Sequence, residues 1–162
     1  MWCLMTQWRL MAHLNVCAWL AALVLVSQGA GAVEPNASDG IAIQGYDPVS
    51  YFQEEPTKGE PGLSERYQGV EYHFASQANR EAFAANPDQY APEYGGWCAY
   101  AMLEGDTVDV DPRRYKVIDG KLYLFYDGFW GNTLKKWNEK AQKQSDEALV
   151  SKADAQWHSL SD

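Results

Sequence analysis

Apolar residues recur along the chain at spacings that predict short strands and helices. Over residues 65–74, apolar positions alternate with polar ones on either side of Gln68-Gly69, a pattern typical of a hairpin. Residues 116–125 predict a second hairpin, with Asp119-Gly120 as a favoured pair for a type I′ turn. These two hairpins carry the strongest strand signals in the sequence.

Helical spacing follows each of these hairpins. A first helix is expected after Ser76, which can cap it, and it should end at Asn86-Pro87. A second is expected over residues 133–143, and a third after Ser145. The apolar stripes predicted to be buried comprise Ala78, Phe83, Ala84, Leu134, Trp137, Ala141, Leu149, Ala153 and Trp157.

Shorter signals complete the pattern. Val108 and Val110 alternate with acidic residues and suggest an edge strand that Pro112 stops, and residues 97–103 suit a short helix. Mixed short strands and helices indicate an α+β single domain, a small antiparallel sheet of short strands and hairpins covered by several helices. We expect residues 116–125 and 70–74 to join one antiparallel sheet.

The N-terminus has the pattern of a cleavable signal peptide at residues 1–32. Residues 14–26 are almost wholly apolar, which is too short for a comfortable membrane span. Ala30-Gly31-Ala32 then offers the small residues that a signal peptidase accepts. The mature chain is expected at residues 33–162, with a disordered leader at about 33–39, in the periplasm or secreted, and without a stable membrane anchor.

The net charge of the chain and the spacing of its basic residues argue against two classes of partner. The formal net charge is −9, and removal of Arg9 with the signal peptide makes it −10. No run of basic residues occurs, so neither nucleic acid nor an anionic membrane surface is expected as a partner. The sequence does not give the oligomeric state.

Cysteine usage is the most informative chemical feature. Cys3 and Cys17 lie in the predicted signal peptide, which leaves Cys98 as the free cysteine of an exported chain. Thiols in oxidising compartments are usually paired. A lone one indicates burial, a metal, an intermolecular disulfide or redox chemistry.

One interpretation of this thiol is that it binds a soft metal ion. Cys98 follows two glycines and is expected in the first turn of its helix, where the thiol pKa should fall. Met102 lies one turn on, and a thiolate with a thioether suits monovalent copper. His73, on the predicted strand, is a possible third ligand. The alternative is a core cysteine with a gap-filling methionine, and a strand histidine bonded to Glu71 or water.

Other chemistries are also open. A Cys–His nucleophile would need a group that orients the base, and the sequence shows none, so no catalytic activity is assigned. A non-metal redox or structural thiol is a second possibility. A third is a small-ligand binding module with an aromatic cleft near Tyr46, Tyr94 and Trp97.

A series of short motifs then follows in order along the chain. They are Gly45-Tyr46-Asp47-Pro48-Val49-Ser50-Tyr51-Phe52, Tyr72-His73-Phe74-Ala75-Ser76, Asn79-Arg80, Phe83-Ala84-Ala85-Asn86-Pro87, Tyr94-Gly95-Gly96-Trp97-Cys98-Ala99, Val117-Ile118-Asp119-Gly120-Lys121-Leu122-Tyr123-Leu124 and Lys152-Ala153-Asp154-Ala155-Gln156-Trp157. Together they resemble the exported, stand-alone branch of the YHS-domain family.

This resemblance implies a metal-binding module, since the family occurs within copper and heavy-metal transporters. In the transporter branch, cysteines stand at the places that correspond to Ser50, Ala75 and Asn79 here. Only Cys98, from the Gly-Gly-x-Cys motif, remains as a ligand of that type. The sequence therefore predicts an exported YHS-like domain that binds or handles a soft metal, with copper as the cofactor.

Overall fold

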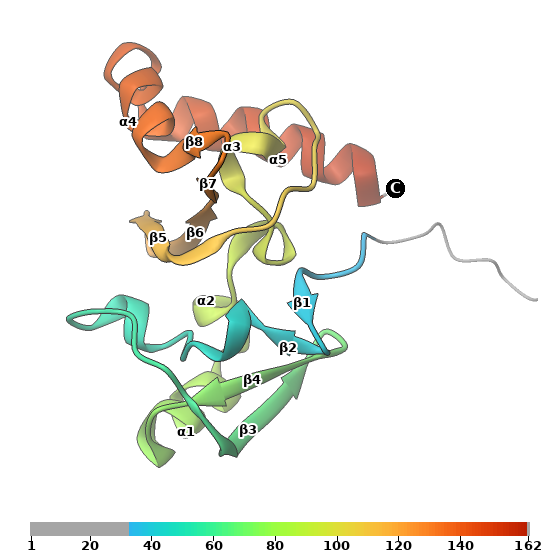
Figure 1. Ribbon diagram of the computed structural model, residues 1–162, viewed down its shortest axis with the longest axis vertical. Coiled ribbons are helices and arrows are strands. Elements are labelled where there is room, and N and C mark those ends of the chain that lie inside the picture. Colours follow the sequence, from blue (N-terminus) through green and yellow to red (C-terminus); the bar gives the residue numbers. More distant parts are fainter. Residues whose placement is uncertain (1–32, 162) are drawn as a thin grey trace, which may run out of the picture.

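The computed structural model describes residues 33–161, so the predicted signal peptide lies outside the described residues. The elements form two groups, one around β1–β4 with α1, and one around β5–β8 with α4 and α5 (Figure 1). Buried side chains form two clusters, one centred on the first group but completed by Leu122 and Leu124 from the second, and one within the second group. The α+β class expected from the sequence is confirmed.

The first group is built on a four-stranded sheet in the order β1-β2-β4-β3. β3 and β4 pair antiparallel, and the turn between them places Gln68 and Gly69 at positive φ, as a type I′ turn requires. β2 pairs with β4 in parallel, so the sheet is mixed. The bounds are β1 Ala37–Ser38, β2 Ile41–Ala42, β3 Glu60–Tyr67 and β4 Val70–Phe74.

Helix α1 (Gln77–Ala85) covers this sheet and follows the predicted boundaries. The Ser76 hydroxyl accepts a hydrogen bond from the backbone N–H of Asn79 at 3.1 Å, which caps the first turn. Phe83 is fully buried, and its ring centroid lies 5.2 Å from that of Phe74. Of the predicted stripe, only Phe83 packs into the first cluster, whereas Ala78 and Ala84 are exposed.

The second group pairs β5 (Asp111–Ile118) with β6 (Lys121–Phe125), as the Asp119-Gly120 turn predicted. Helices α4 (Thr133–Gln144) and α5 (Asp146–Ser161) cover this hairpin. Trp137 is fully buried, with its ring centroid 5.5 Å from that of Phe125. The remaining elements are η1 Ile43–Gly45, η2 Ser50–Phe52, α2 Pro87–Tyr90, η3 Glu93–Gly96, α3 Ala99–Met102, β7 Asp127–Gly128 and β8 Gly131–Asn132.

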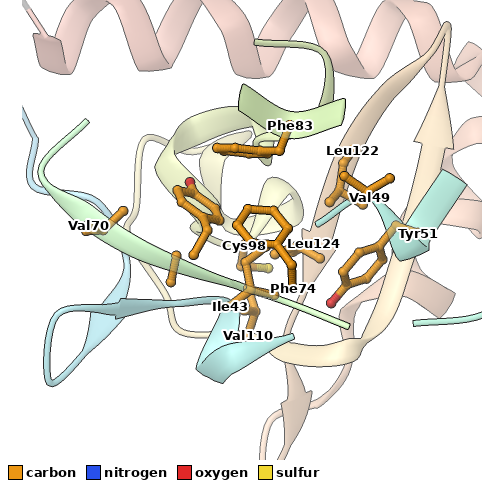
Figure 2. Close-up of a cluster of buried hydrophobic side chains, with 12 residues drawn as sticks. Ile43, Val49, Tyr51, Val70, Phe74, Phe83, Cys98, Val110, Leu122 and Leu124 are labelled. Atoms are coloured by element: carbon orange, nitrogen blue, oxygen red, sulfur yellow. The ribbon is translucent and has the colours of Figure 1, made fainter. Parts of the chain in front are cut away.

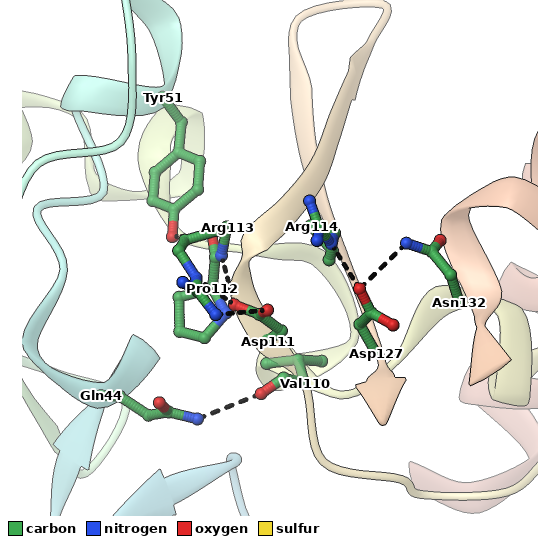
Figure 3. A network of polar contacts seen from close by, with 9 residues as sticks. All are labelled: Gln44, Tyr51, Val110, Asp111, Pro112, Arg113, Arg114, Asp127 and Asn132. Carbon is green, nitrogen blue, oxygen red and sulfur yellow. Dashed lines mark hydrogen bonds and ion pairs between the residues drawn. The ribbon is translucent and has the colours of Figure 1, made fainter. Parts of the chain in front are cut away.

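The expectation of one shared antiparallel sheet is wrong, because β4 and β5–β6 belong to separate sheets. Among the described residues, β6 pairs with β5 and has an isolated parallel bridge between Leu122 and Pro92, and it does not pair with β4. The two groups meet instead through side chains. The Tyr51 hydroxyl donates to the Pro112 carbonyl at 2.8 Å, and the Gln44 amide donates to the Val110 carbonyl at 3.0 Å (Figure 3).

The predicted edge strand at Val108 and Val110 is also wrong. These residues are not in a strand, and Pro112 lies inside β5 rather than stopping one. Proline lacks an N–H, and it is tolerated here because the β5–β6 register is irregular between Asp111 and Tyr115. The Val108 carbonyl instead accepts a hydrogen bond from the Cys98 N–H at 2.9 Å.

The segment expected as a leader contacts the body of the protein. Ala37–Ser38 forms β1, the Asn36 N–H donates to the Gly95 carbonyl at 2.9 Å, and the Trp97 indole N–H donates to the Glu34 carbonyl. Within residues 33–161, no helix has the length and apolar character needed to cross a membrane.

An ion pair ties α5 to the second sheet and makes stability depend on pH. Burial by itself raises the pKa of Asp146, but hydrogen bonds from Lys116 and from the Trp137 indole N–H outweigh it and hold the pKa below its usual value. A depressed folded-state pKa contributes stability above the unfolded-state value of about 3.9, and this contribution is lost as the pH falls through the folded-state value. The stabilising effect of Asp146 is therefore expected at neutral pH and not in strong acid.

Replacing Asp146 with asparagine tests this dependence. The variant should be less stable than the parent at pH 7, and the difference between them should shrink as the pH falls below about 4. Urea unfolding at several pH values gives both free energies. A difference that stayed constant across this range would show that the Asp146 charge does not contribute.

Candidate functional site

Cys98 is positioned by a sharp turn that glycine makes possible. Gly95 and Gly96 have φ of 59° and 85°, in the left-handed region that residues with a Cβ rarely adopt. Cys98 then has extended backbone angles and is the N-cap of α3, one residue before the helical turn in which it was expected. The turn brings the side chain inward rather than toward solvent.

The thiol is completely buried, at 0% exposure, within the first cluster. Figure 2 shows it among Ile43, Phe74 and Leu124. The N–H of Tyr126 donates to Sγ at 3.4 Å, and the Thr133 hydroxyl oxygen also lies 3.4 Å from Sγ. The thiol therefore has two polar contacts in an otherwise apolar environment.

These contacts suit both protonation states of the sulfur. In the thiol form, Sγ–H donates to Thr133 Oγ1, which in turn donates to the Tyr126 carbonyl at 2.8 Å. In the thiolate form, the Thr133 hydroxyl can turn to donate to sulfur, beside the Tyr126 N–H. Neither partner of the sulfur could be predicted from the sequence, because Tyr126 and Thr133 lie 28 and 35 positions from Cys98.

Met102 lies one turn beyond Cys98, and its N–H donates to the Cys98 carbonyl at 3.0 Å. It is also fully buried, but it belongs to the second cluster, with Phe125 and Trp137. The two sulfur-bearing residues are thus four positions apart in one helical turn, and their side chains pack in different clusters.

His73 lies on the other side of β4 from the thiol. Residues alternate across a strand, and Phe74, which packs in the cluster of Cys98, faces the opposite way. His73 is buried, and its Nε2 lies 3.1 Å from a Glu71 carboxylate oxygen. The structure therefore brings Cys98 and Met102 into one turn and leaves His73 apart from them.

A cavity of about 490 Å³ lies over His73 and is lined also by Gly45, Lys58 and Gly59. The Nδ1 edge of the imidazole faces Gly45, since a Cβ at that glycine would stand 3.4 Å from Nδ1. Among residues 33–161, no group of three or more His, Cys, Asp or Glu side chains is arranged to hold a metal ion.

The aromatic residues expected to form one cleft are distributed differently. Tyr46 packs with the first cluster and lies beneath the Lys58 ammonium, whereas Tyr94 and Trp97 belong to the second cluster. Burial, together with the hydrogen bond from its hydroxyl to Asp154 at 2.9 Å, raises the pKa of Tyr94. The three rings therefore do not line one cleft, although Tyr94 lines a separate cavity of about 380 Å³ together with Trp157 and Lys121.

Asp47 is a buried polar centre that the sequence did not reveal. Its carboxylate is fully buried and accepts hydrogen bonds from the N–H groups of Val49 and Ala75, both at 2.8 Å, and from the Asn79 amide at 2.6 Å. The Ser50 hydroxyl donates to the Asp47 carbonyl at 2.6 Å.

The resemblance matched Ser50, Ala75 and Asn79 to cysteine positions of the transporter branch. The fold gathers all three around Asp47, although they come from different elements. None of the three is a cysteine in this chain, so the thiol site that the resemblance implies for that branch cannot be carried over.

Comparison with known proteins gives one family match. Residues 56–94, which include β3, β4, α1 and α2, match the family model of the YHS domain. No curated protein and no solved structure matches the chain. The matched segment includes His73 and Asn79 but ends before Cys98. Residues 56–94 are therefore similar to a YHS domain, as the motifs of the sequence indicated.

Proposed function

We propose that this protein binds and handles a soft metal ion, monovalent copper, in the periplasm or outside the cell. Cys98 is the primary ligand, as thiolate, and Met102 is the second sulfur ligand. The observation that carries the proposal is the position of the Cys98 sulfur, within 3.4 Å of the Tyr126 N–H and the Thr133 hydroxyl in an apolar core. Hydrogen bonds of this kind stabilise a thiolate, the form that binds metals.

The chemistry of the donor set supports copper over harder ions. Thiolate and thioether ligands select monovalent copper, whereas carboxylate and carbonyl oxygens suit magnesium or calcium. Both sulfur-bearing side chains are fully buried, which keeps water from the site and favours a low coordination number. His73, on the far face of β4, is a third ligand only if the protein rearranges.

A second candidate function is the binding of a small organic ligand in the cavity over His73. Glu71 holds Nε2 of the imidazole, which leaves Nδ1 as the atom that faces Gly45 and the cavity. Lys58 lines the same cavity and supplies a positive charge. This arrangement suits a small molecule with both a hydrogen-bonding group and a negative charge.

Titration with monovalent copper under anaerobic conditions tests the first function. We expect one equivalent to bind and Cys98→Ser to abolish binding. Met102→Leu keeps the volume and should weaken affinity without unfolding the protein. Thr133→Val keeps the shape but removes the hydroxyl, and it should weaken affinity by at least about tenfold, since a hydrogen bond to a charged group contributes about 1.5–3 kcal/mol.

Two further variants separate the candidates. His158→Gln, in the last turn of α5, is a control that should not change copper binding. His73→Gln should leave copper binding intact if Cys98 and Met102 suffice. Copper binding that persists in the Cys98→Ser variant would rule out Cys98 as the ligand. Absence of any stoichiometric binding would leave the buried thiol as a structural or redox group and direct attention to the cavity over His73.

A further inference from the structure

The hairpin β7–β8 ends in two adjacent aromatic rings that face solvent. Phe129 is 89% exposed and Trp130 is 73% exposed, far more than any other large hydrophobic residue that the structure describes. Their ring centroids lie 5.0 Å apart in an edge-to-face arrangement. We call Phe129 and Trp130 the aromatic tip. Each such ring exposes an area that a folded protein ordinarily buries.

The hairpin that carries the tip is fixed by hydrogen bonds at its base. Asp127 pairs with Asn132 in the strand register, and the Thr133 N–H donates to the Tyr126 carbonyl at 2.9 Å. The Trp130 N–H lies 3.3 Å from the Tyr126 hydroxyl, which accepts from it. The aromatic tip is therefore held in place by its backbone while its rings remain free of the core.

Two lysines lie beside the tip. The Lys136 ammonium donates to the Trp130 carbonyl at 3.0 Å, and Lys135 precedes it; both are exposed in the first turn of α4. Cations at this end of a helix oppose the helix dipole, and that turn contains no acidic residue to offset them. Helix stability does not explain this placement, whereas an anionic partner would.

The acid nearest to the tip is neutralised. Asp127 is the one acidic residue in residues 126–138. Its carboxylate accepts from the Arg114 guanidinium at 2.7 Å and from the Asn132 amide at 3.1 Å (Figure 3). The surroundings of the aromatic tip are therefore positively charged, although the chain as a whole carries −9.

The positive charge around the aromatic tip is part of an uneven distribution of basic and acidic residues along the chain. Residues 113–143 hold eight of the 13 Lys and Arg residues of the chain but only three of its 22 Asp and Glu residues. No run of basic residues marks this in the sequence, because the cations come from β5, β6 and α4. The fold brings β5 and α4 together, as the 3.1 Å contact between Lys116 Nζ and the Asn138 amide oxygen shows.

We propose that the aromatic tip is a membrane-contacting element, whose rings enter the interfacial region of a bilayer that contains anionic lipid. Lys135 and Lys136 then lie at the depth of the lipid phosphates. Tryptophan favours this interface because its ring is apolar and its N–H is polar. The binding is peripheral and reversible, which agrees with the finding that no described helix could span the bilayer.

The size of the tip favours lipid over a protein partner. A stable protein interface buries about 800 Å² on each side. The tip offers two side chains, roughly 150–250 Å² each, on a narrow hairpin. Such an element can enter a bilayer surface, and each adjacent lysine should strengthen the binding by about fivefold at low salt.

Vesicle binding tests the proposal with the purified, exported protein. Vesicles of phosphatidylglycerol and phosphatidylcholine in equal parts should bind it, and pure phosphatidylcholine should bind it at least tenfold more weakly. Phe129→Ser with Trp130→Ser should lower binding at least tenfold. Lys135→Gln with Lys136→Gln should lower it by about 25-fold at low salt. Val117→Ser, at a half-exposed position on β5, is the matched control and should change nothing.

A second readout reports on the tip itself. Insertion should shift Trp130 fluorescence to shorter wavelength with anionic vesicles, and Trp130→Phe should keep the binding but lose this shift. Anionic vesicles that bind the serine double variant as well as the parent would overturn the proposal. Failure of the parent protein to bind anionic vesicles would also overturn the proposal. That result would point to a protein partner for the tip.

Discussion

Replacing Trp137 with alanine should lower the free energy of unfolding by about 3–5 kcal/mol. The indole is fully buried and packs against Phe125 between α4 and the second sheet. Its removal also takes away the N–H that donates to Asp146 at 2.7 Å, and Asp146 holds α5 through Lys116. The loss thus combines a cavity with a weakened polar contact at the α5 terminus.

The chain offers a matched control for this change. Trp130→Ala removes the same side chain from a position that is 73% exposed, and it should change the free energy of unfolding by less than about 0.5 kcal/mol. Phe83→Ala, in the first cluster, should cost about 3–5 kcal/mol, as Trp137→Ala does. Urea unfolding followed by circular dichroism gives all three values. Equal stabilities of the Trp137 and Trp130 variants would contradict the assignment of the core.

The elements that the sequence predicted well are those with local causes. The Asp119-Gly120 and Gln68-Gly69 pairs both adopt positive φ and fix the register of their hairpins. The Ser76 cap and the Asn86-Pro87 pair bound α1 because capping and proline act over three or four residues. The buried stripe with Trp137 followed from helical spacing alone.

What the sequence could not predict depends on contacts between distant segments. The pattern of the two hairpins does not show whether they share a sheet, and in the structure they belong to separate sheets. The partners of the Cys98 sulfur, Tyr126 and Thr133, come from either end of the β7–β8 hairpin. Nothing in the local pattern at those two residues marks them as neighbours of a thiol.

The distribution of charge over the surface also depends on contacts between distant segments. The basic residues of 113–143 form no run, because they are spread along β5, β6 and α4. The structure places the Lys136 ammonium against the carbonyl of an exposed tryptophan.

Replacing Asp47 with alanine should lower the free energy of unfolding by at least about 3 kcal/mol. The carboxylate satisfies two backbone N–H groups and the Asn79 amide, all in the interior, and each buried donor left without a partner costs about 1–3 kcal/mol. Among residues 33–161 no buried polar side-chain atom lacks a partner, so the parent has no such defect to begin with. Glu54→Ala, at an exposed position in the adjacent loop, is the control and should be nearly neutral.

A double-mutant cycle shows whether Asp47 acts as a hub. Asn79→Ala alone should cost less than Asp47→Ala, because it leaves the carboxylate with two of its three donors. In the Asp47→Ala background, Asn79→Ala should cost little or nothing more, since its partner is already gone. Strictly additive losses would mean that the carboxylate does not join these segments. Non-additive losses would establish that the hydrogen bond between the Asp47 carboxylate and the Asn79 amide joins α1 to the segment that carries Asp47.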